Sequence, residues 1–322
     1  ASTHSGYLDF LACELERVQH HGVLFAAQDF AGTFAIIQTI RDGRDKPLSD
    51  ILHQLSLHFL NFDPPTIRRS LELSLRLWLT ISIPSSDIHV GPVFAGERSI
   101  EWDANISLDT LLRPYFISYE RLDTPTSHIK IDPAFTVAYL VNTCGLRLRW
   151  TDNIAEHLKL DLGRVSLTVY RHKICLIYHL NDQQSFPISG DLLEEMLDTV
   201  NLLFPFGDAA TKQLLSKEGQ RSMYSLGSCN RSRKIELNRY RYFREELEHL
   251  IDFFQGSPRT WKQLAFDRRN KLEWSAFWVG VMGTILALVS LISLPCTIIQ
   301  TIYSIKAYNL AVAQERNGLG AG

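Results

Sequence analysis

Residues 274–305 read WSAFWVGVMGTILALVSLISLPCTIIQTIYSI and contain no aspartate, glutamate, lysine or arginine. The hydrocarbon core of a bilayer is about 30 Å thick, and a helix of about 20 residues crosses it. This stretch of 32 residues is long enough to cross with some tilt. The alternative, a buried helix of a soluble protein, is usually shorter and carries some charge. The stretch therefore predicts a single transmembrane helix.

The two ends of this stretch carry residues typical of a membrane interface. Trp274 and Trp278 stand at its beginning and Tyr303 near its end, as in the aromatic belts of transmembrane helices, and Lys306 follows it directly as a further interface residue. Five cations shortly precede the stretch, and two follow it before the end of the chain. The preceding five are Arg259, Lys262, Arg268, Arg269 and Lys271. Positive charge favours the cytosolic side, so we expect a single-pass protein of an intracellular membrane with residues 1–273 in the cytosol.

Two further features of the C-terminal region shape this expectation. Only a short tail, residues 306–322, follows the apolar stretch, which is the layout of a tail-anchored protein. Pro295 lies inside the stretch and removes one backbone hydrogen bond. It either kinks the helix or ends it ahead of a shorter interfacial segment, and the sequence leaves both possibilities open.

Small residues form one stripe along the predicted transmembrane helix. They alternate at spacings of four and three: Ala276, Gly280, Gly283, Ala287 and Ser290. That spacing keeps them on one face, where small side chains let two helices approach closely. We therefore expect a homo-oligomer or a complex with a partner's membrane helix. Two alternatives stay open: small residues are common in any transmembrane helix, and the same face could line a pore.

The averages over the chain conceal this region. The 322 residues have 33 basic and 35 acidic side chains, a formal net charge of −2 and a mean hydropathy of −0.05. Such a balance argues against a nucleic-acid partner. Five scattered cysteines exclude a disulfide scaffold. The averages combine a fairly polar region of about 270 residues with one uncharged segment.

The region before the membrane segment reads as an α+β domain dominated by helices, with a short central β unit. Residues 1–218 form this domain, 219–233 a flexible loop rich in glycine and serine, and 234–273 an amphipathic helix with a juxtamembrane segment. Helices are predicted over 8–22, 47–60, 64–78, 108–112, 132–145, 154–160, 191–204 and 208–215. Strands are predicted over 99–102 and 146–150, with a hairpin of 165–170 and 174–178. Residues 84–98 read as a loop.

Several separated segments together resemble a known group of proteins. They are Leu75–Leu79 (LRLWL), 150–154 (WTDNI) with His157 and Leu158, 202–205 (LLFP) with Asp208, 267–270 (DRRN), and Trp274 with Phe277 and Trp278. This combination resembles a large group of filamentous-fungal proteins with a cytosolic α+β region and a C-terminal transmembrane segment, over most of residues 70–305. The resemblance implies organisation and a fungal source, but no reaction and no catalytic residues. Similarity to CorA-type magnesium channels is weaker, because those have two membrane helices and a Gly-Met-Asn signature.

Motifs of the common enzyme classes are absent from the sequence. It has no phosphate-binding loop, no G-x-S-x-G, no H-E-x-x-H and no C-x-x-C, so we expect no cofactor and no metal. Asp152 and His157 are weak candidates for acid–base catalysis near a helix start. The alternative is structural, with Asp152 as a helix cap and Trp150 in the core. A basic run, 231–244, reads as a solvated helix face or a contact with anionic lipid.

Three functions remain open on these grounds. The first is a membrane-anchored interaction or structural protein that associates through its transmembrane helix, with the bilayer as its other partner. The second is a membrane-tethered enzyme acting on an apolar small molecule, which requires a deep pocket with converging polar groups. The third is an oligomeric channel or membrane-perturbing protein.

Overall fold

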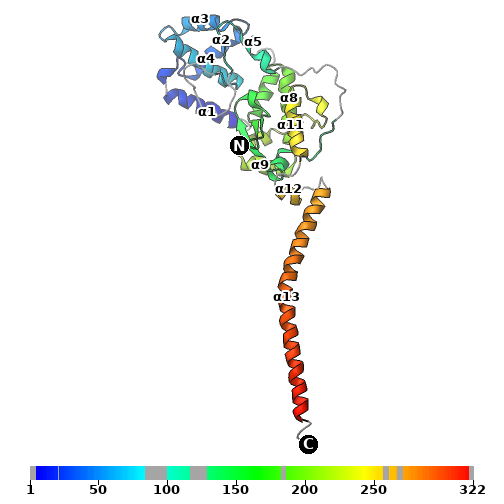
Figure 1. The fold of residues 1–322 in the computed structure, drawn as a ribbon. Helices are drawn as coiled ribbons and strands as arrows, with labels where there is room; N and C mark the ends of the chain where they lie inside the picture. Colours follow the sequence, from blue (N-terminus) through cyan, green and yellow to red (C-terminus); the bar gives the residue numbers. More distant parts are fainter. Residues whose placement is uncertain are drawn as a thin grey trace. The chain divides into compact units, whose positions relative to one another are not determined.

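The computed structural model describes residues 5–20, 22–83, 100–116, 129–182, 186–256, 261–266 and 271–318. The chain divides into two compact units, residues 1–257 and 258–322. The first unit contains a helix-dominated α+β fold and the second a long apolar helix (Figure 1). This confirms the predicted fold class. The loop predicted over 84–98 lies outside the described residues.

Helices α1 to α4 lie together in one part of the first unit, and α8, α9 and α11 lie together in another (Figure 1). The helices of the first half are α1 (Ser5–His20), η1 (Gly22–Leu24), α2 (Phe30–Asp42), α3 (Leu48–His58), α4 (Pro64–Leu79), α5 (Leu108–Leu112) and η2 (Arg113–Phe116). Those of the second half are α6 (Val137–Asn142), η3 (Ile154–Glu156), α7 (Lys173–Asn181), α8 (Gly190–Leu203), α9 (Ala209–Lys217), α10 (Arg221–Ser225), η4 (Leu237–Arg239) and α11 (Arg244–Gln255).

A three-stranded sheet lies in the middle of the first unit. Its strands are β1 (Arg147–Thr151), β2 (Leu160–Asp161) and β3 (Ser166–Tyr170), in the order β1-β3-β2. β1 pairs with β3 in parallel, with Leu148 opposite Leu167 and Trp150 opposite Val169. β2 pairs with β3 in the antiparallel sense. β3 is therefore the central strand, with a partner along each edge.

This topology explains why the predicted hairpin is wrong. Residues 174–178 belong to helix α7, which begins directly after β3. Because β1 and β2 already occupy both edges of β3, no edge remains for a following strand. The helix predicted over 154–160 is also corrected, since the chain forms only η3 there and then enters β2. Residues 100–102, the described part of the strand predicted over 99–102, form no strand.

The region after α9 is more structured than expected. The loop predicted over 219–233 contains α10. The long helix predicted from residue 234 is shorter, with η4 first and α11 beginning only at Arg244. Glu195 of α8 supplies the reason, because its carboxylate accepts hydrogen bonds from the backbone N–H groups of residues 241, 242 and 243, at 2.7, 2.7 and 2.8 Å. These three N–H groups therefore donate to the Glu195 side chain and not to backbone carbonyl oxygens within a helix.

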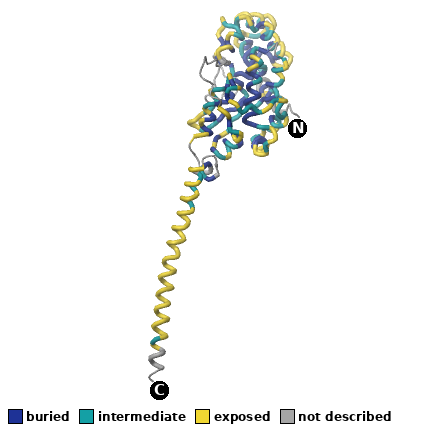
Figure 2. Tube along the Cα trace, turned by 90° about the vertical axis from the view of Figure 1, so that its right-hand side faces the viewer, coloured by how far each residue is buried: buried dark blue, intermediate teal, exposed yellow. Residues whose placement is uncertain are grey.

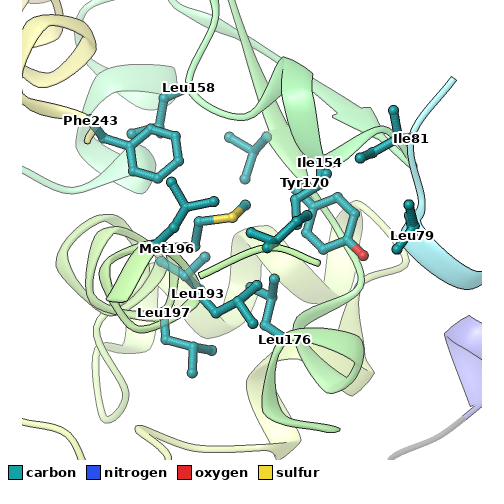
Figure 3. Packing of buried hydrophobic residues seen from close by; sticks show 14 of the residues in the cluster. Leu79, Ile81, Ile154, Leu158, Tyr170, Leu176, Leu193, Met196, Leu197 and Phe243 are labelled. Atoms are coloured by element: carbon teal, nitrogen blue, oxygen red, sulfur yellow. The ribbon is translucent and has the colours of Figure 1, made fainter. Parts of the chain in front are cut away.

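One large hydrophobic cluster joins most of these elements. Figure 2 shows buried residues throughout the first unit and an exposed surface along the C-terminal helix. In the core, Tyr170 of β3 and Leu176 of α7 face Leu193 and Met196 of α8 (Figure 3). All four side chains are almost completely buried. Removal of this apolar surface from water is the main force that stabilises the unit.

The second unit consists of α12 (Trp261–Phe266) and α13 (Lys271–Gly318). Among the described residues, α13 is the one helix long and apolar enough to span a membrane, with a candidate span Trp274–Ala313 of 40 residues and mean hydropathy 2.2. The helix continues through Pro295 and does not end there. It also continues past Lys306, so the part of the predicted tail up to Gly318 is helical.

Candidate functional site

A cavity of about 900 Å³ lies between α1, α2, α4 and α7 in the first unit. We call it the α2–α7 cavity. Most of its lining is apolar, including Leu11 of α1, Phe34 and Ile37 of α2, Leu77 of α4 and Ile177 of α7. Its volume and lining match the concave, mainly apolar sites that bind small molecules. It is therefore the candidate functional site of this protein.

Helix α4 buries leucines on two sides, in two different hydrophobic clusters. Leu71, Leu75 and Leu79 belong to the main core. Leu73 and Leu77 belong to a second cluster with Phe10 and Phe25. The leucines that alternate from Leu71 to Leu79 thus belong to a helix with two apolar faces.

The polar groups in the interior of the cavity already have partners. The Tyr7 hydroxyl donates to the carbonyl oxygen of Leu77 at 2.9 Å, and the Thr33 hydroxyl donates to that of Asp29 at 2.9 Å. The His179 ring stacks on Phe186 with centroids 3.7 Å apart. The hydroxyl protons of Tyr7 and Thr33 are thus used within the protein, whereas their oxygens can still accept a hydrogen bond.

The titratable groups of the interior are held in their uncharged forms near pH 7. Burial raises the pKa of the Tyr7 phenol and raises the pKa of the Cys175 thiol to about 12. Burial lowers the pKa of His179 to about 4. All three shifts share one cause, since a charge is less stable away from water.

One side of the cavity opens to solvent. Phe30, Phe34 and Tyr178 line it and are all more than half exposed. Arg41 and Asp182 line the same cavity and form an ion pair, with Nη2 and Oδ2 3.5 Å apart. The lining thus combines an apolar interior with one cation and one anion at partly exposed positions.

The sequence candidate Asp152 lies outside this cavity. Its Oδ1 accepts hydrogen bonds from Arg171 Nε at 2.5 Å and His172 Nε2 at 2.6 Å. Burial by itself raises the pKa of this carboxyl, but the bonds and charges of His172 and Arg171 outweigh it and hold the pKa below its ordinary value. The predicted capping role belongs to Asn153, whose side chain accepts from the backbone of Ala155.

The other sequence candidate, His157, is fully enclosed. Its Nε2 lies 2.8 Å from Thr199 Oγ1, and its Nδ1 accepts from the backbone N–H of Tyr170 at 3.3 Å. Thr199 donates its own proton to the Met196 carbonyl oxygen, so this network assigns the ring proton to Nε2. Both ring nitrogens are occupied, and His157 and Asp152 have different partners. Neither residue lines the cavity.

The predicted interface tryptophans have a contact that the sequence did not indicate. The indole N–H groups of Trp274 and Trp278 both donate to the carbonyl oxygen of Ala265, at 3.1 and 3.3 Å. This links α13 to α12 within the second unit. Tyr303 and Lys306 are exposed on α13. The membrane-interface role of these residues stays a prediction.

Sequence reasoning missed the cavity because its residues come from four helices. One signal was present: Phe30, Phe34, Ile37 and Arg41 recur at helical spacing along α2. Within the described ranges, no group of three or more histidine, cysteine or acidic side chains could hold a metal ion. No family model, curated protein or solved structure matches the chain, so the resemblance to the fungal group stays a prediction.

Proposed function

We propose that this is a membrane-anchored protein whose first unit binds an apolar small molecule in the α2–α7 cavity. The observation that carries the proposal is the cavity itself, about 900 Å³ with a mainly apolar lining, in a chain that also contains a helix able to span a membrane. The cations before α13 favour a cytosolic position for the first unit. There it would receive ligands that partition into the bilayer.

Binding fits the cavity better than catalysis does. A catalytic nucleophile needs a lowered pKa or a neighbouring base. Burial instead raises the pKa of the Cys175 thiol to about 12 and raises that of Tyr7. His179 stacks on Phe186, and burial lowers its pKa to about 4, so its ring is a weak base near pH 7. The described lining thus supports a ligand site with no activated group.

Photolabelling tests the proposal directly. The full-length chain in phosphatidylcholine nanodiscs is irradiated with azi-adamantane, a small uncharged photoreagent, and labelled peptides are identified by mass spectrometry. We expect label on peptides from α2 and α7. Ala35→Trp should reduce it several-fold, because Ala35 lines the cavity from an exposed position and the indole would fill the space.

Ala210→Trp is the matched control, since Ala210 is exposed on α9 and does not line the cavity. It should leave the labelling of α2 and α7 unchanged. Label confined to α13, or equal labelling of α2 and α7 in both variants, would contradict ligand binding in the cavity.

A second proposal is that α13 mediates self-association in the membrane. Its apolar side chains are exposed along its length, and a Cβ atom at Gly280 or Gly283 would meet nothing within 4 Å. This open stripe leaves room for a second helix at close approach. The hydroxyls of Thr297 and Thr301 donate to carbonyl oxygens four residues earlier, so helix packing rather than their donors would supply the contact.

Cross-linking in detergent tests this second proposal. We expect a dimer or larger oligomer whose yield falls several-fold in Gly283→Leu, because the larger side chain separates the two helices. The control is Thr284→Leu, one residue off the stripe. A strict monomer in both the wild type and the variants would count decisively against self-association.

A further inference from the structure

The charged residues around the α2–α7 cavity restrict the charge of the ligand, in addition to the apolar character that the lining requires. This inference rests on the proposed function. Arg41 and Asp182 are the charged residues of the lining, and they neutralise each other as an ion pair. Deeper groups add no charge, because Tyr7, Cys175 and His179 all stay neutral near pH 7. The described lining residues therefore carry no net charge that could balance an ionised ligand.

An ionised group would therefore be poorly stabilised at this site. A charge that leaves water without a compensating partner has a large free-energy cost. An anion near Arg41 would also lie near the carboxylate of Asp182, and a cation near Asp182 would lie near the guanidinium of Arg41, since the two are 3.5 Å apart. Each attraction is largely cancelled by the neighbouring repulsion.

A hydroxyl group suits the same pair well. The Arg41 guanidinium only donates hydrogen bonds and the Asp182 carboxylate only accepts them. A hydroxyl does both, so it could accept from Arg41 and donate to Asp182 without disturbing their charge balance. Both side chains are partly exposed, at 36% and 42%, which leaves them accessible to such a group.

The body of the ligand is indicated by the aromatic rings of the lining. Five aromatic side chains line the cavity, and they come from four helices. They are Tyr7 of α1, Phe30 and Phe34 of α2, Trp78 of α4 and Tyr178 of α7. Flat aromatic faces pack efficiently against a rigid ring system and bury large apolar areas. A volume of about 900 Å³ accommodates a molecule of several fused rings.

We propose that the α2–α7 cavity binds an uncharged alcohol with an apolar ring body, the chemistry of a sterol, and that Arg41 and Asp182 together select against ionised analogues. The hydroxyl end would lie at the Arg41–Asp182 pair and the rings among the aromatic side chains. In this arrangement Asp182 determines specificity by repelling anions that Arg41 alone would attract.

Competition against the azi-adamantane label tests this proposal in the same nanodiscs. Cholesterol and cholesterol sulfate are the probes, because they differ by one charged group at the hydroxyl position. We expect cholesterol to suppress labelling of α2 and α7 at a concentration at least about tenfold lower than the sulfate does. In Asp182→Asn this preference should largely disappear, since Arg41 is then free to balance the sulfate.

The possible outcomes separate the two proposals. Equal competition by both sterols in the wild type, or a preference that Asp182→Asn leaves intact, would overturn the selection against charge. Failure of both sterols to compete, while azi-adamantane still labels the cavity, would overturn the sterol class and leave the proposed function standing. Absence of the label itself would overturn the proposed function.

Discussion

Replacing Asp198 with alanine is expected to destabilise the first unit by about 3 kcal/mol, because two cations would lose a buried partner. Asp198 lies on α8 with only 1% of its surface exposed. Its two oxygens accept from Arg231 Nε at 2.6 Å and Nη2 at 2.9 Å, and Lys234 Nζ lies 2.5 Å from Oδ2. Burial alone raises the pKa of this carboxyl, yet the two cations outweigh burial and lower it.

Thermal unfolding of the full-length chain, followed by near-ultraviolet circular dichroism in detergent, measures this effect. A loss of about 3 kcal/mol corresponds to a fall in Tm of about 10 °C for a unit of this size. Glu194→Ala is the matched control, because Glu194 also contacts Arg231, at 3.1 Å, but is 46% exposed. It should cost less than about 1 kcal/mol. Equal losses in the two variants would show that burial of the pair is unimportant.

The contacts of Arg231 and Arg233 correct one prediction for the basic run 231–244, that its side chains form a solvated helix face. Arg231 is anchored to Asp198, and Arg233 donates to the carbonyl oxygens of Leu202, Pro133 and Phe135. Neither residue belongs to a solvated helix face. The sequence could not reveal this, because each partner lies 30 or more positions away along the chain, and local charge patterns carry no information about such pairings.

Local sequence patterns did predict the helices that depend mainly on their own residues. The double proline and the following leucines predicted α4, and the apolar, uncharged stretch from Trp274 predicted α13. The strand prediction for residues 174–178 was wrong for a different reason. Their short alternation suits either a strand or a helix, and the choice was made by the pairing of β3 with β1 and β2. Tertiary context overrode local propensity there.

The candidate site was beyond local patterns altogether. Its walls come from α1, α2, α4 and α7, which span residues 5–181. Each helix contributes ordinary apolar residues that individually read as core. The cavity arises only from the way the four helices pack together. The spacing of residues within any one helix cannot predict it. Conversely, Asp152 and His157 stood out as chemically interesting in the sequence, but their hydrogen bonds place both in structural networks.

Acidification is expected to destabilise the first unit through His157. Burial lowers the pKa of this imidazole to about 3 in the folded protein, whereas an unfolded histidine has a pKa of about 6.5. Between these two values the unfolded chain binds a proton that the folded chain does not. The free energy of unfolding therefore falls as pH decreases from about 6.5 towards 3, by up to about 1.4 kcal/mol per pH unit from this residue. His179 acts in the same direction, because its pKa is lowered to about 4.

The geometry explains why the folded chain resists this proton. Nδ1 of His157 accepts from the backbone N–H of Tyr170, so a proton on Nδ1 would place two donors against each other. Nε2 is already engaged with Thr199. Lowering the pH from 7 to 5 should thus remove about 2 kcal/mol of stability through His157, measured by urea unfolding of the full-length chain in detergent.

His157→Gln separates this titration from the packing of the residue. Glutamine can still donate a hydrogen bond to Thr199 but does not titrate, so the variant should lose less stability than the wild type between pH 7 and pH 5, whatever its stability at pH 7. An identical loss in the wild type and in His157→Gln would assign the acid sensitivity to other groups. Comparing the two pH values within each protein keeps the substitution's own packing cost out of the result, because that cost is the same at both.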